Sequence, residues 1–320
     1  MIKKEKETEM EMTEEKQKII LDTDIGGDID DTWALAMLLG SPECDLKLVS
    51  TVSRTDYRAR LTAKYLQLCG RSDVPVSIGT TCPKVDKFDQ QGPWLEGFQL
   101  SDYAGKVYPD SVEAIIETMD QTPGIVTFIE IGPMTNLALV LEKRPDLAER
   151  MDCILLAGSV YKQYLGVPGV CSEYNVLIDI PAAKKVFSTK FHRLRISPLD
   201  SCGTIFLKGE EYERLRAGTN HAAQELFAIY DVWSKYMAEM ENRDHNIDPA
   251  HGSSLLADVI AIHIANGGAF LQYETLPLIV SDLGETLIDH ENGNPVEVAV
   301  ELVNEAEFCK DMVDRILSAG

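Results

Sequence analysis

Five aspartates fall within ten residues near the start of the chain, in the sequence DTDIGGDIDD at positions 22–31. The segment follows the apolar run Ile19–Leu21 and precedes the apolar run Trp33–Leu39, so it joins a predicted buried strand to a predicted helix. Carboxylates this close repel one another unless a cation lies among them, and Ca²⁺ and Mg²⁺ prefer oxygen ligands. A solvated acidic turn is the alternative, but the two glycines inside the segment indicate a shaped backbone. The segment therefore predicts a metal-holding loop.

Apolar runs typical of strands alternate with helical patterns along the rest of the chain, which predicts the α/β class. Runs such as Ile125–Ile129 are continuously apolar, as expected of parallel strands with both faces buried. We predict an open, mostly parallel, Rossmann-like sheet with helices on both faces and a few added C-terminal strands within residues 271–303. The other predicted strands cover residues 18–24, 46–53, 74–79, 125–132, 153–158 and 194–198. The predicted helices cover residues 31–39, 58–69, 111–119, 135–142, 181–188, 210–217, 221–241, 254–266 and 305–318.

The composition indicates one globular domain in the cytoplasm. The chain has 320 residues, 45% of them hydrophobic, and shows no internal repeat or linker, so residues 18–320 are predicted to form a single domain. Residues 1–17 are charged and lack a signal-peptide core, which predicts a disordered or fraying tail. Seven cysteines without a Cys-x-x-Cys pair indicate reduced thiols. The net charge of −22 argues against nucleic acid and anionic membranes as partners and allows a neutral small molecule.

Polar residues follow several of the predicted strands, in segments that should meet where parallel strands end. These segments are 22–24, 130–133, 158–159, 172–175 and 198–200. Asp258 lies further along, in the apolar helical run Leu255–Ile262, where an unpaired buried carboxylate is costly. A metal shared with the acidic loop would remove this cost. The alternative is that Asp258 lies on an exposed helix stripe or caps a neighbouring element.

The acidic loop and two later segments together resemble one enzyme family. DTDIGGDIDD followed by Trp-Ala-Leu resembles the N-terminal signature of the inosine–uridine preferring nucleoside hydrolases, Asp-x-Asp-x-Gly-x-Asp-Asp, with two residues inserted before the final pair. Residues 131–138 resemble the family's Gly-Pro-Leu-Thr-Asn segment, and Glu173-Tyr174-Asn175 with Asp179 resembles its Glu-Phe-Asn…Asp segment. The resemblance implies Ca²⁺-dependent hydrolysis of the N-glycosidic bond of ribonucleosides, a nucleoside or riboside as small-molecule partner, and a homodimer or homotetramer.

The resemblance also implies a role for each matching residue. Asp24 would bind the Ca²⁺ and act as general base toward the water bound to it. The carboxylates of Asp31 and Asp258 and the backbone carbonyl of Ile131 would complete the metal site. The hydroxyl groups of the ribose would be bound by Asp30, Asn175 and Glu173. Asp22 would orient the loop.

The family pattern is not fully retained: the Asn expected after the second strand is not evident in residues 53–56, a pocket Asn upstream of Glu173 is replaced within residues 165–170, and a third replacement concerns the leaving base. Members of the inosine–uridine type have a histidine directly before the last metal-binding aspartate, where it helps to protonate the leaving base, and here that position is Ala257. His245 and His251 are candidates to replace it, although histidines in polar loops are more often simply solvated. Stacking of the base on an aromatic ring is the other possibility. Trp94 and Trp233 are the predicted base contacts, with core packing as the alternative for both.

Two other functions fit parts of the sequence. Haloacid-dehalogenase-like phosphatases also have an apolar strand that runs into Asp-x-Asp, so Asp22 would be a nucleophile and Asp24 an acid/base, but Gly26 stands where Thr or Val is normal. A catalytically silent nucleoside- or sugar-binding protein on the same scaffold would explain the missing histidine. The retention of Asp24, Asp31 and Asp258 argues against it, so hydrolysis is the leading hypothesis.

Overall fold

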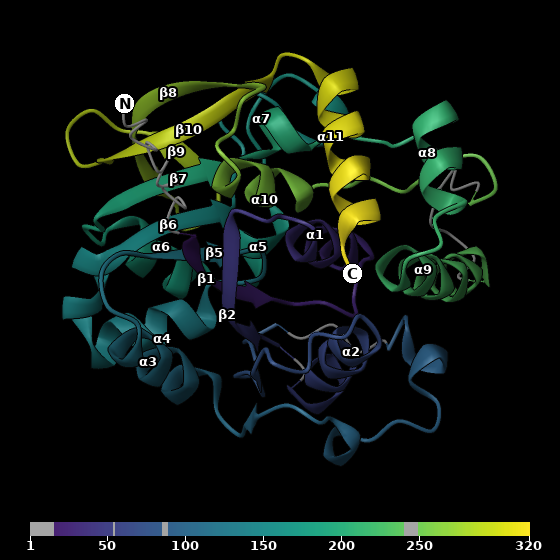
Figure 1. Ribbon diagram of the computed structural model, residues 1–320. Helices are drawn as coiled ribbons and strands as arrows, with labels where there is room; N and C mark the ends of the chain where they lie inside the picture. Colours follow the sequence, from purple (N-terminus) through teal and green to yellow (C-terminus); the bar gives the residue numbers. More distant parts are fainter. Residues whose placement is uncertain (1–15, 54, 85–88, 240–248) are drawn as a thin grey trace, which may run out of the picture.

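The computed structural model describes residues 16–53, 55–84, 89–239 and 249–320 (Figure 1). The ten strands of these residues form one sheet, in the order β4-β3-β2-β1-β5-β6-β7-β10-β8-β9. They are β1 (Gln17–Thr23), β2 (Cys44–Thr51), β3 (Val76–Ser77), β4 (Val107–Tyr108), β5 (Val126–Glu130), β6 (Met151–Leu156), β7 (Arg193–Ser197), β8 (Leu271–Val280), β9 (Thr286–Ile288) and β10 (Asn294–Leu302). Every pair of neighbouring strands is parallel from β4 along this order as far as β10. The last two strands differ, because β8 pairs antiparallel with both β10 and β9. The predicted mostly parallel sheet with added C-terminal strands is confirmed.

The central strands are continuously apolar because each one supplies two hydrophobic cores. Ile19 and Leu21 of β1 pack into the core on one face of the sheet, and Ile20 between them packs into the core on the other face. Ile129 and Phe128 of β5 divide in the same way. All five side chains are fully buried. This burial on both faces is the physical reason why the strands carry no polar alternation.

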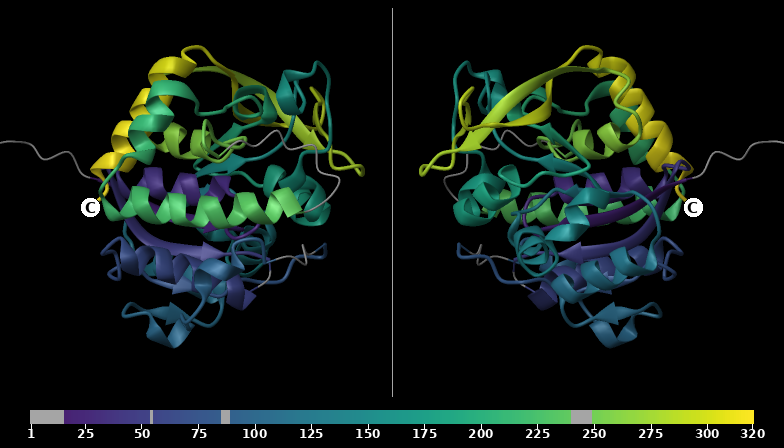
Figure 2. Two further views of the ribbon diagram at one scale, coloured as in Figure 1. Left: turned by 90° about the vertical axis from the view of Figure 1, so that its right-hand side faces the viewer. Right: turned by 90° about the vertical axis from the view of Figure 1, so that its left-hand side faces the viewer.

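Helices cover both faces of the sheet, as predicted (Figure 1). One face carries α3 (Ser111–Gln121), α4 (Thr135–Lys143) and α6 (Ile180–Phe187). The other carries α1 (Asp30–Leu39), α2 (Thr55–Leu68), α9 (His221–Glu239), α10 (Val259–Ala265) and α11 (Glu305–Ser318). The remaining helices are α5 (Tyr174–Ile178), α7 (Leu199–Cys202) and α8 (Gly209–Arg216). In the side views of Figure 2, the long helix α9 lies across the molecule beside α1, with which it is in contact.

The sequence prediction fails at the short elements. The strand β4 and the helices α5 and α7 had no predicted counterpart, because two to five residues carry too little periodicity. The helix predicted over residues 254–266 begins only at Val259. Its first residues instead run beside residues 205–207, where the N–H groups of Ser253 and Leu256 donate to the carbonyls of Leu207 and Ile205, each at 2.9 Å.

Three predicted irregular segments can be placed in part. Of the tail predicted over residues 1–17, only the last two residues lie inside the described ranges, and β1 already begins at Gln17. Residues 80–109, for which no helix or strand was predicted, contain two 3-10 helices, Gly92–Leu95 and Leu100–Asp102. Residues 161–174, also without a predicted element, contain a third, Tyr164–Gly166. None of the helices in the described ranges is long and apolar enough to cross a membrane.

Candidate active site

A cavity of about 360 Å³ opens where the central parallel strands end. The segments that follow β1, β5, β6 and β7 all reach it, as the carboxyl ends of neighbouring parallel strands should. The structure therefore brings together most of the residues that the sequence singled out. Those lining the cavity are Asp24, Asp30, Asp31, Ile131, Glu173, Asn175 and Asp258.

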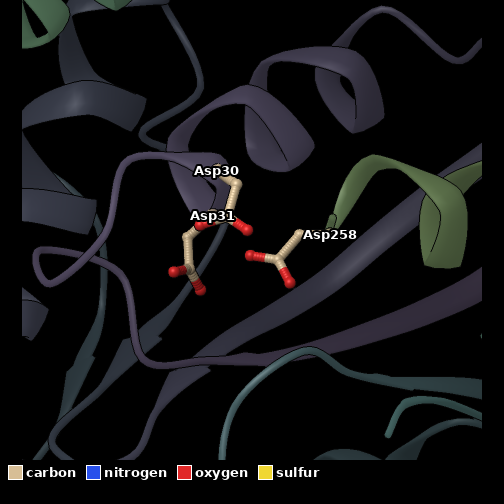
Figure 3. Close-up of side chains that lie close together, drawn as sticks. All are labelled: Asp30, Asp31 and Asp258. Atoms are coloured by element: carbon tan, nitrogen blue, oxygen red, sulfur yellow. The ribbon is translucent and has the colours of Figure 1, made fainter. Parts of the chain in front are cut away.

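Three of these carboxylates form a cluster. Figure 3 shows Asp30 and Asp258 pointing toward one another, with Asp31 beside them. One oxygen from each of the three side chains lies within 4.8 Å of the others. Asp258 is 3% exposed and stands at the N-cap position of α10, yet its side chain makes no capping hydrogen bond. Neither an exposed helix stripe nor helix capping therefore explains Asp258.

The local backbone holds the acidic loop against the end of β5. Thr23, the last residue of β1, donates its hydroxyl to Asp31 Oδ1 at 2.5 Å, and α1 begins at Asp30. Gly132 lies across from this loop, and a Cβ at that position would come within 2.9 Å of the Asp24 backbone nitrogen. A glycine is needed there because any side chain would push the two segments apart.

Burial and mutual repulsion set the protonation of the cluster. Burial raises the pKa of Asp30, Asp31 and Asp258 well above the ordinary value, and the neighbouring carboxylates raise each pKa further. Burial also raises the pKa of Glu173 to about 7. Such carboxyls release protons when a divalent cation binds, because the cation favours the ionised form that burial disfavours.

Asp24 lies next to the cluster but is paired differently. Its charge is one of the causes that raise the pKa of Asp31 and Asp258, so it is close to both. Its Oδ2 lies 3.7 Å from Nη2 of Arg58, whose Nη1 donates to the carbonyl of Ile25 at 3.0 Å. The Arg58 side chain is 3% exposed and, among the described residues, is the one basic group that lines the cavity. Sequence analysis missed it because it lies on α2 and no motif marks it.

The predicted sugar contacts also serve the structure. Asn175 donates from Nδ2 to the carbonyls of Ile131 (3.1 Å) and Leu156 (3.2 Å), so it links the ends of β5 and β6. Glu173 is 2% exposed and caps α5, where its carboxylate accepts hydrogen bonds from backbone N–H groups of that helix. It also accepts from the N–H of Gly158 at 3.1 Å. These bonds fix both side chains in the cavity wall before any ligand binds.

Asp22 is enclosed behind the cavity and does not line it. Its carboxylate accepts from the Ser50 hydroxyl at 2.7 Å and from Nδ2 of Asn136 at 3.1 Å. Asn136 belongs to the motif segment at residues 131–138 and also donates to the carbonyl of Thr51, so Asp22 ties β1 to β2 and α4. A nucleophile must reach its substrate, and Asp22 cannot, which removes the phosphatase alternative.

The structure does not bring the two predicted tryptophans into the cavity lining. Trp94 is 8% exposed and donates its Nε1 to Glu225 at 3.1 Å. Trp233 is 1% exposed, stacks on Tyr230 at 5.8 Å between ring centroids, and donates its Nε1 to Gln90 at 2.9 Å. Only Gln90 of this group lines the cavity, so the contact of Trp233 with the site is indirect.

Two tyrosines that sequence analysis did not select line the cavity instead. Tyr164 and Tyr174 are 40% and 42% exposed, and the backbone N–H of Tyr174 donates to the Tyr164 hydroxyl at 3.3 Å. The sequence offered one signal for each: Tyr164 lies in a segment without a predicted helix or strand, and Tyr174 lies inside the Glu-Tyr-Asn motif. Ala257 lines the cavity as well. His251 is exposed and outside the lining, and His245 lies outside the described residues.

The donor set fits a hard divalent cation. The clustered side chains are all carboxylates, Asp24 lies beside them, and the lining includes Ile131, whose carbonyl faces Asn175. No cysteine or histidine of the described residues lines the cavity. Oxygen-only ligands suit Ca²⁺ or Mg²⁺, whereas zinc sites are usually built from nitrogen and sulfur.

The fold and the cavity define an α/β enzyme with a site for a divalent cation. A model of the family described as inosine-uridine preferring nucleoside hydrolase matches residues 19–310. The chain therefore belongs to the inosine-uridine preferring nucleoside hydrolases, and it is an N-glycosyl hydrolase of nucleosides.

Relatives of known sequence and structure span most of the chain. A probable uridine nucleosidase of Arabidopsis thaliana is 28% identical over 233 residues, 69% of this chain and 71% of that protein. An uncharacterized protein of Schizosaccharomyces pombe is 26% identical over 93% of this chain and 98% of its own length. The structure of a purine-preferring ribonucleoside hydrolase from Gardnerella vaginalis superposes with a TM-score of 0.76 at 24% identity, covering 95% of this chain and 99% of that one. That likeness shows the fold.

Proposed function

We propose that the protein hydrolyses the N-glycosidic bond of ribonucleosides to base and ribose with a bound Ca²⁺, and that Asp24 is the general base. The observation that carries this proposal is the gathering of carboxylates from two distant segments, 24–31 and 258, in one cavity. One relative is described as a probable uridine nucleosidase and one structure as a purine-preferring ribonucleoside hydrolase, so we assign no base preference.

The chemistry needs negative charge around the sugar. As the bond from C1′ to the base breaks, positive charge develops on the ribose ring, and nearby carboxylates stabilise it. Asp24 accepts the proton of the attacking water. A cation held by these residues would supply positive charge that makes the attacking water more acidic. We assign the ion to Asp24, Asp31, Asp258 and the carbonyl of Ile131, and the ribose hydroxyls to Asp30, Asn175 and Glu173.

The role of Asp30 can be tested separately, because its carboxylate clusters with Asp31 and Asp258. If Asp30 binds ribose, Asp30→Asn raises KM or lowers kcat while the Ca²⁺ affinity measured by calorimetry stays close to that of the wild type. If Asp30 is a metal ligand, the same substitution weakens Ca²⁺ binding strongly. Asp282→Asn is the control, because it removes a 95% exposed carboxylate that forms only a surface ion pair with Lys184.

The leaving base needs a partner other than the family histidine. Tyr164 and Tyr174 line the cavity, whereas Trp94 and Trp233 are packed away from it. We therefore propose the two tyrosines as the aromatic contacts of the base in place of the tryptophans. Stacking on a ring holds the base in a fixed orientation.

A panel of nucleosides together with p-nitrophenyl riboside tests the proposal. We expect the wild type to release base from at least one nucleoside and Asp24→Asn to lose that activity while its melting temperature is retained. Turnover of p-nitrophenyl riboside alone would mean that the metal and sugar sites work but the base is not activated. Nucleoside binding without any turnover would instead establish the silent-binding alternative and refute hydrolysis.

Compartment and assembly complete the proposal. All seven cysteines are free thiols, as in proteins of a reducing compartment, and we place the protein in the cytoplasm. We also propose a homodimer or homotetramer, which light scattering on the purified chain measures directly. A monomer at micromolar concentration would refute that part.

A further inference from the structure

The cavity at the carboxyl ends of the strands holds more negative than positive side chains. The lining residues that carry a carboxylate are Asp24, Asp28, Asp30, Asp31, Glu173 and Asp258. Arg58 is the one basic residue among the described residues of the lining, and it pairs with Asp24. Even without Asp28, the three clustered aspartates and Glu173 carry twice the charge of a divalent cation when they are ionised. The lining therefore stays negative with the proposed metal in place.

The internal segments that the structure does not describe add no net positive charge to this balance. They are residue 54 and residues 85–88 and 240–248, and together they contain four acidic and three basic side chains. The first fifteen residues contain six glutamates and three lysines. The excess of negative charge at the cavity is therefore not offset by the rest of the sequence around it.

The same lining offers little that could protonate a leaving base. Ala257 is 7% exposed and lines the cavity at the position where the family has a histidine. No histidine, cysteine or lysine of the described residues lines it, and the guanidinium of Arg58 does not give up its proton in proteins. Partial burial and the charge of Glu173 raise the pKa of Tyr164 well above its ordinary value, so this hydroxyl keeps its proton. The carboxylates serve in ionised form, as metal ligands, sugar contacts and general base.

Aromatic rings and a further carboxylate border the mouth of this cavity. Tyr164 and Tyr174 line it and are 40% and 42% exposed. Asp28 also lines the cavity and is exposed, and its charge is one of the causes that raise the pKa of Asp30, so it lies close to the carboxylate cluster. The face of a tyrosine ring attracts a cation. Negative charge together with aromatic faces favours a planar ring that carries positive charge.

We propose, on the basis of the proposed hydrolysis, that the preferred substrates are ribonucleosides whose base carries a positive charge, of which pyridinium ribosides are the simplest. When the bond from C1′ to the ring nitrogen breaks, its electron pair passes to that nitrogen and cancels the positive charge of the ring. The base then leaves as a neutral molecule without accepting a proton. The oxygen of water bonds to C1′, and the proton of this water passes to Asp24. A missing histidine is no disadvantage for such a substrate.

Rates on matched substrates test this proposal with the full chain in about 1 mM Ca²⁺. The probes are nicotinamide riboside, which is cationic, inosine, which is neutral, and p-nitrophenyl riboside, whose leaving group needs no proton. We expect kcat/KM for nicotinamide riboside to exceed that for inosine by at least about 100-fold, the usual contribution of a general acid. Turnover of p-nitrophenyl riboside with nicotinamide riboside no better than inosine would overturn this inference and leave the proposed hydrolysis standing. No turnover of any of the three would refute both.

Binding can be measured apart from bond breaking on Asp24→Asn, which we expect to be folded and inactive. Calorimetry at low ionic strength compares nicotinamide riboside with dihydronicotinamide riboside, a ligand of nearly the same size whose ring carries no charge. We expect the cationic riboside to bind at least about fivefold more tightly. Equal affinities would overturn the proposal, because they would show that the cavity does not recognise the charge of the ring.

A pair of variants tests whether this cavity is the source of the preference. Asp28→Asn should lower the ratio of kcat/KM for nicotinamide riboside to that for p-nitrophenyl riboside by about fivefold, because the mouth loses a carboxylate. Asp73→Asn is the matched control. It removes an exposed carboxylate that pairs with Arg71 at 2.9 Å, three residues before β3 and so at the opposite end of the sheet, and it should change the ratio by less than about twofold. Equal falls in the two variants would overturn the proposal, because they would show attraction to the net charge of the chain.

Discussion

Replacing Asp258 by Asn should make the metal-free protein more stable and the Ca²⁺-loaded protein less stable. Carboxylate oxygens of Asp258, Asp30 and Asp31 lie within 4.8 Å of one another. At an effective dielectric constant near 20, two unit charges at this distance repel by about 3 kcal/mol. Bound protons relieve part of that repulsion, because burial and the neighbouring charges raise the pKa of all three carboxyls. We therefore expect a net gain of about 1–3 kcal/mol for the metal-free variant at pH 8.

For a chain of this length that gain corresponds to roughly 2–4 °C in melting temperature. Differential scanning calorimetry in excess chelator and in about 1 mM Ca²⁺ measures it. The wild type should melt several degrees higher with Ca²⁺. When the free ion exceeds its dissociation constant a hundredfold, binding stabilises the folded chain by about 3 kcal/mol, and Asp258→Asn should lose most of this stabilisation. Asp282→Asn is the control, because it removes an exposed carboxylate and its surface ion pair with Lys184, away from the acidic loop. A variant that melts below the wild type in chelator yet keeps the full Ca²⁺ shift would show that Asp258 does not share a cation with the acidic loop.

Three further predictions concern the same cavity. Arg58→Met should lower kcat by about 10–100-fold with the melting temperature retained, because Arg58 forms an ion pair with Asp24 and donates to the carbonyl of Ile25. An unchanged kcat would show that Arg58 does not position Asp24. Ala257→His should raise turnover of inosine if protonation of the base is the missing step, and no gain would show that another group supplies the proton. In chelator, the free energy of unfolding should fall as the pH rises from about 5 to 7. The pKa of Glu173 is raised to about 7 in the folded chain, so the folded chain binds more protons than the unfolded chain in this window. The expected slope is about 1.4 kcal/mol per pH unit for each such proton. Urea titrations at three pH values measure this slope, and a rising free energy would contradict it.

Local patterns in the chain were enough to predict the fold class and the acidic loop. Strands such as β5 and helices such as α11 were predicted within about two residues, because burial on two faces or on one helical stripe leaves a periodic apolar signal. The spacing of aspartates at residues 22–31 predicted the metal site, because like charges in a short loop require a partner. The short strand β4 and the one-turn helices α5 and α7 leave no such signal.

Contacts between distant segments could be found only in the folded molecule. The pairing of Arg58 with Asp24, the approach of Asp258 to Asp30, and the hydrogen bond from Trp233 to Gln90 all join residues far apart in the chain. The sequence by itself determines most of the strands and longer helices, because the spacing of apolar residues within each segment favours one of the two structures. Which side chains then share a cavity depends on how these elements pack, because the position of each side chain is set by neighbours that its own stretch of sequence does not contain.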